Sequence, residues 1–152
     1  MYKPGAMRRN SILIAMILLQ MCGCATYRSD NPERLLTLPQ HYAEFDLKLA
    51  WEVKPVEGST VIDGVVKNIR YYQMDELEIW VLSLDAEGKV VHRAADFVYS
   101  LKENEVAQFT LKLPRLASGS RIRFMYRYIG IEGGGDSRDS MSWRQSFDSV
   151  VP

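Results

Sequence analysis

The chain is poor in cysteine, and this limits the chemistry open to it. Only two of its 152 residues are cysteines, Cys22 and Cys24, and both lie near the N-terminus. Two thiols this close in sequence are badly placed for a structural disulfide and too few for a metal site. The rest of the chain has none, so we expect an apolar core to stabilise the fold. The sequence argues against redox chemistry.

An excess of positive charge is also missing. The chain has 19 basic and 19 acidic side chains, and residues 1–23 hold three of the basic ones (Lys3, Arg8 and Arg9) and no acid. Without that segment, 16 of the 19 basic residues remain against 19 acidic ones, a net charge of −3. A weakly acidic domain is poorly suited to binding nucleic acid, whose phosphates require a basic surface. We therefore expect no nucleic-acid partner.

The apolar run near the N-terminus is too short to span a bilayer comfortably, which takes about 20 residues. This run, Ile12–Leu19, follows the basic leader Met1–Asn10. A basic leader before a short apolar stretch is typical of a signal peptide. The alternative is a buried helix of a soluble protein, but such a continuous apolar run leaves that helix no polar face.

The four residues Met21-Cys22-Gly23-Cys24 resemble the lipobox of bacterial lipoproteins. The resemblance implies signal cleavage between Gly23 and Cys24, a diacylglycerol on the Cys24 sulfur, and fatty acylation, such as palmitate, of the new amine. Two or three acyl chains anchor a protein durably, whereas one does not. Ala25, in place of the Asp of inner-membrane retention, implies the outer membrane, facing the periplasm. The alternative is a plain secretory signal with a coincidental cysteine.

We divide the chain into a lipoprotein signal peptide (1–23), a lipidated cysteine with a tether (24–40), and a β-sandwich domain (41–152). The tether is polar and carries Pro32 and Pro39, which is typical of a linker. We expect Leu35, Leu36 and Leu38 to dock on the domain, with a short helical turn there.

From residue 45 onward, apolar and polar residues alternate, which predicts strands with one buried face. The predicted strands are 45–53, 60–68, 75–84, 90–98, 105–113, 121–131 and 143–150. Seven short strands without an amphipathic helix favour an all-β fold, an immunoglobulin-like (fibronectin type III-like) antiparallel β-sandwich. A small barrel is the competing architecture.

Residues 61–113 resemble FxLYD-type and related water-stress β-sandwich domains. The matching stretches are Val61–Asn68, Leu82–Asp85, Glu87–Val91, Leu101 and Phe109–Leu111. These motifs are structural. The resemblance implies a fibronectin type III-like module, generally without enzymatic activity, of a kind found in bacterial envelope proteins.

We find no residue pattern that predicts catalysis. His41 and His92 have no acid or cysteine at a spacing that suggests metal ligation, so we interpret them as surface residues and expect no metal. The run Gly133–Gly135 lacks the Lys-Ser/Thr of a phosphate loop and favours a hairpin hinge. No nucleophile frame is recognisable. The sequence therefore predicts a protein that is not an enzyme and has no cofactor.

One pattern suggests a binding surface. On the third predicted strand Glu76 and Glu78 share a face with Trp80, Leu82 and Leu84, and on the sixth Arg121, Arg123 and Arg127 share a face with Met125 and Ile129. In an immunoglobulin-like sandwich these strands are antiparallel neighbours, so we expect Glu–Arg pairs, with Trp80 beneath an arginine. Apolar side chains on an outer sheet face suggest docking, centred on Trp80, Leu82, Arg123 and Arg127. The alternative is that the tether or the last strand covers this face, or that a bulge turns Trp80 inward.

Together these observations predict a lipid-anchored lipoprotein of the cell envelope, with membrane contact through its anchor. Its non-catalytic sandwich would bind or scaffold another envelope component, with an envelope protein as the expected partner. A periplasmic accessory subunit of a secretion or transport complex is the alternative.

Overall fold

The computed structural model describes residues 31–132 and 140–152. The predicted signal peptide, Cys24 and the Gly133–Gly135 run lie outside these ranges. One short helix and eight strands are formed by the described residues: α2 (Arg34–Thr37), β1 (Gln40–Ala43), β2 (Leu47–Val56), β3 (Ser59–Asn68), β4 (Gln73–Leu84), β5 (Val90–Leu101), β6 (Val106–Pro114), β7 (Arg121–Ile131) and β8 (Ser140–Val150).

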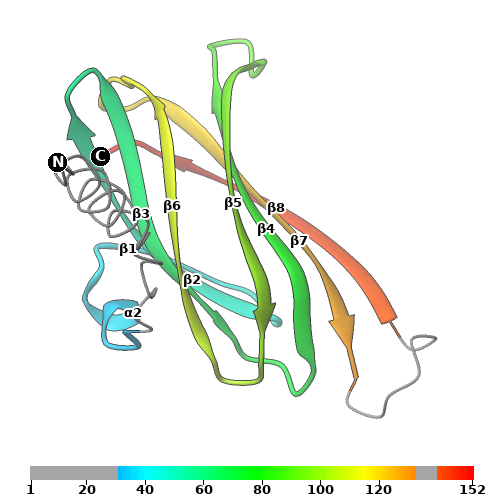
Figure 1. Cartoon of the computed structure of the whole chain (residues 1–152). Coiled ribbons are helices and arrows are strands. Elements are labelled where there is room, and N and C mark those ends of the chain that lie inside the picture. The colour runs from blue at the N-terminus through cyan, green and yellow to red at the C-terminus, as the bar shows by residue number, and fades with distance from the viewer. Residues whose placement is uncertain (1–30, 133–139) are drawn as a thin grey trace, which may run out of the picture.

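The strands form two antiparallel sheets packed face to face (Figure 1). Sheet A has the order β1-β2-β3-β6, and sheet B has the order β5-β4-β7-β8. If β2 to β8 are matched in sequence order to immunoglobulin strands A to G, β5 takes the place of strand D. It pairs with β4 in sheet B, instead of joining the other sheet as in constant-type domains. The predicted all-β, immunoglobulin-like sandwich is confirmed.

The inner faces of the two sheets hold the apolar residues that the alternation predicted. On β7 the residues that alternate with the predicted outward arginines are at most 1% exposed: Ile122, Phe124, Tyr126 and Tyr128. Gly64 on β3 makes room for the ring of Phe109, since a Cβ there would lie 2.5 Å from that ring and 2.6 Å from the Ala50 carbonyl oxygen. Close approach of neighbouring strands within sheet A thus sets the position of the Phe109 ring in the core.

A buried carboxylate joins the sheets at one end. Asp46 is fully buried and precedes β2 of sheet A. Its Oδ1 accepts hydrogen bonds from the Tyr126 hydroxyl and the Leu47 N–H, both at 2.9 Å, and its Oδ2 accepts one from the Tyr128 hydroxyl at 3.0 Å. Burial, together with the Asp46 charge, raises the pKa of Tyr126 and Tyr128, and the hydrogen bond with Tyr72 adds to the rise at Tyr128. Both hydroxyls therefore stay protonated donors. Such satisfied polar networks specify how elements pack.

Part of the predicted tether packs on the outer face of sheet A. Leu38, only 7% exposed, forms a small cluster with Ala50, Val65 and Val106, and Leu35 packs against it. Arg34 of α2 donates to Asp63 on β3 at 2.9 Å. The predicted helical turn and the docking of Leu35 and Leu38 are confirmed. The prediction for Leu36 is wrong, because its side chain is 84% exposed.

The chain departs from the predicted strands in three places. Residues 40–43 form an additional strand, β1, so Phe45 lies in the turn to β2 and is 47% exposed instead of facing the core. On β4, the register with β7 shifts between Asp75 and Glu78, and Glu76 has a φ of 52°. This bulge removes Glu76 from the alternation that placed it beside Glu78. A second shift, between Ser83 and Leu84, accompanies the burial of Leu84, which was predicted to face outward.

Candidate functional site

The predicted docking residues lie together on the outer face of sheet B. Strands β4 and β7 are antiparallel neighbours, as predicted, and the register places Trp80 opposite Met125 and Leu82 opposite Arg123. Trp80, Leu82 and Arg123 are partly exposed, and Arg127 is exposed. No bulge turns Trp80 inward, and the tether residues that the structure describes pack on the other sheet. The last strand, β8, pairs beside β7 within sheet B and does not lie over this face. Among the described residues, neither the tether nor the last strand therefore covers the predicted docking residues.

A predicted Glu–Arg pair is present on this face. Glu78 lies opposite Arg127 in the register. The Arg127 guanidinium donates two hydrogen bonds to it, at 2.7 Å to Oε2 and 2.5 Å to Oε1. The Arg127 hydrogen bonds lower the pKa of Glu78, so this carboxyl is charged at neutral pH. Such two-point contacts are strong and directional.

Within the described residues, no arginine stacks on Trp80, contrary to the prediction. Its indole N–H donates to Glu78 Oε2 at 2.8 Å, which ties the ring to the ion pair. Stacking of this kind occurs instead at Arg70, whose guanidinium carbon lies 5.3 to 5.6 Å from the ring centres of Phe45, Tyr71 and Tyr72. The hydrogen bond fixes the orientation of Trp80 on the outer face.

Arg123 has a partner that the sequence analysis missed. Asp148 on β8 lies opposite Arg123 and accepts from its Nε at 2.5 Å and from Nη2 at 2.9 Å. The Arg123 hydrogen bonds hold the pKa of Asp148 below its ordinary value. The alternation in 143–150 places Asp148 on the face opposite Trp143 and Phe147, and this pattern could have identified it as an outward acid.

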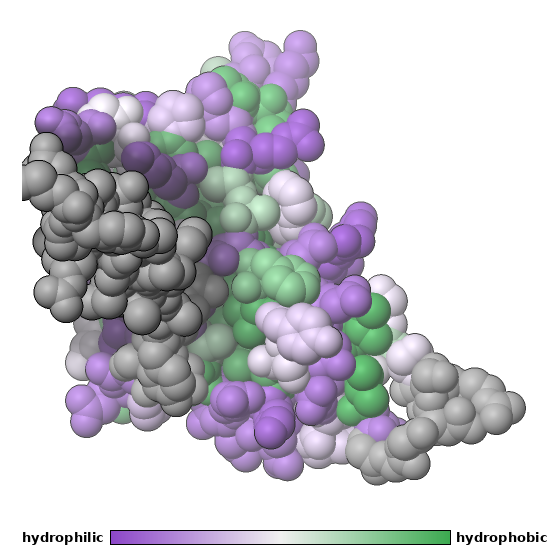
Figure 2. Space-filling model, in the orientation of Figure 1, coloured by the Kyte–Doolittle hydropathy of each residue, from purple (hydrophilic) through white to green (hydrophobic). Residues whose placement is uncertain are grey.

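Strand β5 supplies apolar surface that was also missed. Ala95 lies opposite Trp80, and Phe97 lies opposite Glu78 and is 48% exposed. Trp80, Ala95 and Phe97, with Glu78 and Asp96, line a shallow hollow of about 330 Å³. We call one group of neighbouring apolar outward residues of sheet B the apolar stripe; it consists of Trp80, Leu82, Ala95, Phe97 and Met125. Figure 2 shows apolar surface, interrupted by hydrophilic side chains, along the β5 side of the molecule.

Two ion pairs border the apolar stripe, and Trp80 and Met125 lie between them in the strand register. Glu78–Arg127 and Arg123–Asp148 both belong to the outer face of sheet B, and their charged groups remain partly exposed. Apolar surface bordered by charged groups has the composition of a protein-binding surface. It offers a partner apolar area together with oriented charges of both signs.

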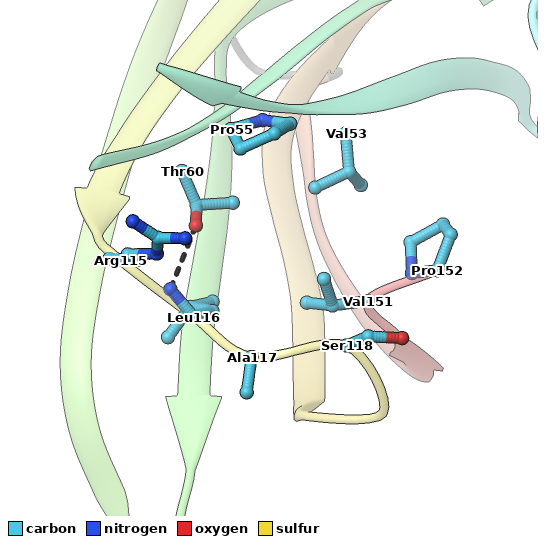
Figure 3. A pocket seen from close by; sticks show the side chains of 9 residues that line it. All are labelled: Val53, Pro55, Thr60, Arg115, Leu116, Ala117, Ser118, Val151 and Pro152. Atoms are coloured by element: carbon cyan, nitrogen blue, oxygen red, sulfur yellow. Dashed lines mark hydrogen bonds between the residues drawn. The ribbon is translucent and has the colours of Figure 1, made fainter. Parts of the chain in front are cut away.

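A separate pocket of about 370 Å³ lies at the end of the sandwich near the C-terminus (Figure 3). Val53 and Pro55 of β2 face Val151 and Pro152 across it, and the Leu116 N–H donates to the Thr60 hydroxyl at 2.9 Å. Arg115 is the ionisable side chain among the residues that line it. This lining provides one positive charge in a mostly apolar setting.

His41 and His92 are both exposed, which agrees with their interpretation as surface residues. In residues 31–132 and 140–152, no group of three His, Cys, Asp or Glu side chains is arranged to hold a metal ion. None of the helices in those ranges is both long and apolar enough to cross a membrane. Gly23 and Cys24, the predicted cleavage and lipidation residues, lie outside them.

Comparison with known proteins adds little to this description. No family model matches the chain, and no curated protein matches it in sequence. Among solved structures it is similar to the GAE domain of GGA2p from Saccharomyces cerevisiae, with 11% identity and a TM-score of 0.48 over 74% of this chain and 96% of that one. It is also similar to the yeast GGA1 GAE domain, with 11% identity and a TM-score of 0.46 over 74% and 99% of the two chains.

Proposed function

We propose that this protein is a lipoprotein of the bacterial cell envelope whose β-sandwich docks on another envelope protein through the outer face of sheet B. Lipidation at Cys24 would hold it at a membrane, the outer one if Ala25 acts as in enteric bacteria. The domain would act by binding and not by catalysis. The observation that carries the docking proposal is the apolar stripe, uncovered by any described part of the chain and bordered by two ion pairs.

The position of the tether supports this arrangement. Only seven residues separate Cys24 from Pro32, and at roughly 3.5 Å per residue they span at most about 28 Å between the two Cα atoms. The chain then packs on sheet A through α2 and Leu38. The anchored segment therefore reaches the domain on the sheet A side, which leaves the outer face of sheet B available to a partner.

The anchor is tested by membrane fractionation of a Cys24→Ser variant. We expect the parent to sediment with membranes. The variant should remain in the soluble fraction, because it lacks the sulfur that carries the diacylglycerol. Cys22→Ser is the matched control, since Cys22 lies in the segment that is removed. Intact-mass measurement should find a lipidated N-terminus at Cys24. If Cys24→Ser sediments as the parent does, the anchor proposal is wrong.

Docking is tested by crosslinking in native envelopes, followed by mass spectrometry. The variant combines Trp80→Ala with Arg123→Glu, which removes the centre of the apolar stripe and reverses one of its bordering charges. A control combines Leu36→Ala with Lys112→Glu, two exposed residues outside this face. We expect the first pair to abolish a specific crosslinked product and the second to retain it. If the two double variants are both folded and give the same amount of the crosslinked product, the docking proposal is wrong.

A further inference from the structure

Strand β8 forms an open edge of sheet B. It is eleven residues long, contains no proline or lysine, and pairs only with β7 among the described strands. The other edges are less suited to pairing. Strand β1 has four residues, and the adjoining part of β2 carries Pro55. The remaining two edges, β5 of sheet B and β6 of sheet A, lie beside each other. The N–H of Thr110 on β6 is bonded to the Asp96 carboxylate on β5 at 2.7 Å. A long edge without such protection is a template for another strand.

The backbone of β8 shows which residues face this edge. Val151 donates its N–H to the Ser120 carbonyl and accepts from the Gly119 N–H, so its backbone groups point toward the β7 side. In a strand, the backbone N–H and C=O groups of successive residues point alternately toward one neighbouring strand and toward the opposite side. Even-numbered residues of β8 therefore present their N–H and C=O groups outward. The N–H of Ser146 agrees with this, because it is bonded to the Gln145 side chain, at 3.0 Å, and not to β7.

We propose that β8 pairs antiparallel with β8 of a second copy of this chain, with Ser146 on the two-fold axis. A two-fold edge pairing requires outward-facing residues to meet one another. With Ser146 on the axis, Arg144 lies opposite the partner's Asp148, and Asp148 lies opposite the partner's Arg144. An axis at Arg144 would bring two arginines together, and an axis at Asp148 would bring two aspartates together. The register centred on Ser146 is the one that brings Arg144 of each copy opposite Asp148 of the other, so charge favours it.

The charges on β8 within one copy also favour a second copy of the chain as the partner at this edge. Arg144 lies opposite Arg127 in the β7–β8 register, and two like charges in this position repel each other. Its guanidinium forms no hydrogen bond or ion pair inside the described ranges, although its charge adds to the lowering of the Glu78 pKa. The partner's Asp148 would supply the opposite charge. In the free chain the Gln145 side chain satisfies the Ser146 N–H, and pairing would replace it with the partner's Ser146 carbonyl.

A single cysteine on the axis tests the register. In Ser146→Cys the two Cα atoms would lie about 5.5 Å apart, within the range of a disulfide. We expect oxidation of the full chain, in the cells that make it, to yield a covalent dimer. Ser142→Cys is the control, because its two copies would lie roughly 27 Å apart at 3.4 Å per residue. The parent chain, treated in the same way, shows how much covalent dimer forms through Cys22 and Cys24. Subtracting this background makes the result independent of whether Cys24 is lipidated.

Arg144→Asp, combined with Ser146→Cys, separates pairing from folding. The new carboxylate would lie against the partner's Asp148 and lower the crosslinked fraction about tenfold. The same change removes the repulsion from Arg127, so the monomer should unfold at the same or a higher temperature. The proposal is overturned if Ser146→Cys, folded, gives no dimer, if Ser142→Cys crosslinks equally, or if Arg144→Asp leaves crosslinking unchanged.

Discussion

The outer faces of the two sheets are built from similar strands but are covered differently. On sheet A, Ala50, Val65 and Val106 lie beneath Leu38, so the apolar residues of that face are buried by the chain's own tether. On sheet B the apolar stripe remains partly or fully exposed between ion pairs. An apolar outer face is therefore not in itself a binding surface. What distinguishes sheet B is that no described segment covers it.

The largest effect should come from the residue on which both sheets depend. Asp46→Ala would remove the acceptor of two buried hydroxyls, those of Tyr126 and Tyr128, and leave Tyr128 only its hydrogen bond with the Tyr72 hydroxyl. It should lower the free energy of unfolding by about 3 kcal/mol. Asp46→Asn keeps one acceptor oxygen and should lower it by less. Urea denaturation measures both. Equal stability of Asp46→Ala and the parent would contradict the bridging role of this carboxylate.

The same substitution on the two faces should have unequal effects. Leu38→Ala removes a buried side chain and should lower the free energy of unfolding by about 2 kcal/mol. Leu82→Ala, at a partly exposed position on sheet B, should lower it by less than about 1 kcal/mol. Thermal or urea unfolding of the two variants provides the comparison. If Leu82→Ala is the more destabilising, sheet B is covered in a way that the described residues do not account for.

Leu36→Ala marks the boundary of the covered region. Its side chain is 84% exposed beside the buried Leu38, so the free energy of unfolding should change by less than about 0.5 kcal/mol. This variant also serves as the control for Leu38→Ala, because it makes the same chemical change within two residues. A loss as large as that of Leu38→Ala would show that Leu36 is buried by another part of the chain.

The smallest expected effect concerns acid sensitivity on sheet B. The pKa values of Glu78 and Asp148 lie below their ordinary values of 4.5 and 3.8 because of Arg127 and Arg123. A carboxyl whose pKa is lower in the folded state stabilises the fold at a pH above its unfolded-state pKa. This stabilisation is lost as the pH falls through its folded-state pKa. Stability should therefore decline below about pH 4.5. Urea midpoints between pH 7 and 3 should show a shallower decline in Glu78→Gln.

The sequence determined the fold class and the pairing of the central strands of sheet B. Alternation predicted which side chains of β7 are buried, and it placed Glu78 and Arg127 on the facing strands where they pair. It failed where the backbone departs from a regular strand. Neither the bulge at Glu76 nor the turn that exposes Phe45 changes the period of the sequence enough to be recognised.

Only the tertiary structure decided which partner each polar group meets. Asp46 is separated from Tyr126 and Tyr128 by about 80 residues, and Arg123 pairs with Asp148 on a strand whose register the sequence does not specify. The tertiary structure also decided which leucines cover sheet A. Leu35, Leu36 and Leu38 have the same side chain, but Leu35 and Leu38 pack on the sheet and Leu36 is exposed. Local periodicity carries information about neighbours along the chain, whereas contacts between sheets depend on how the whole chain closes.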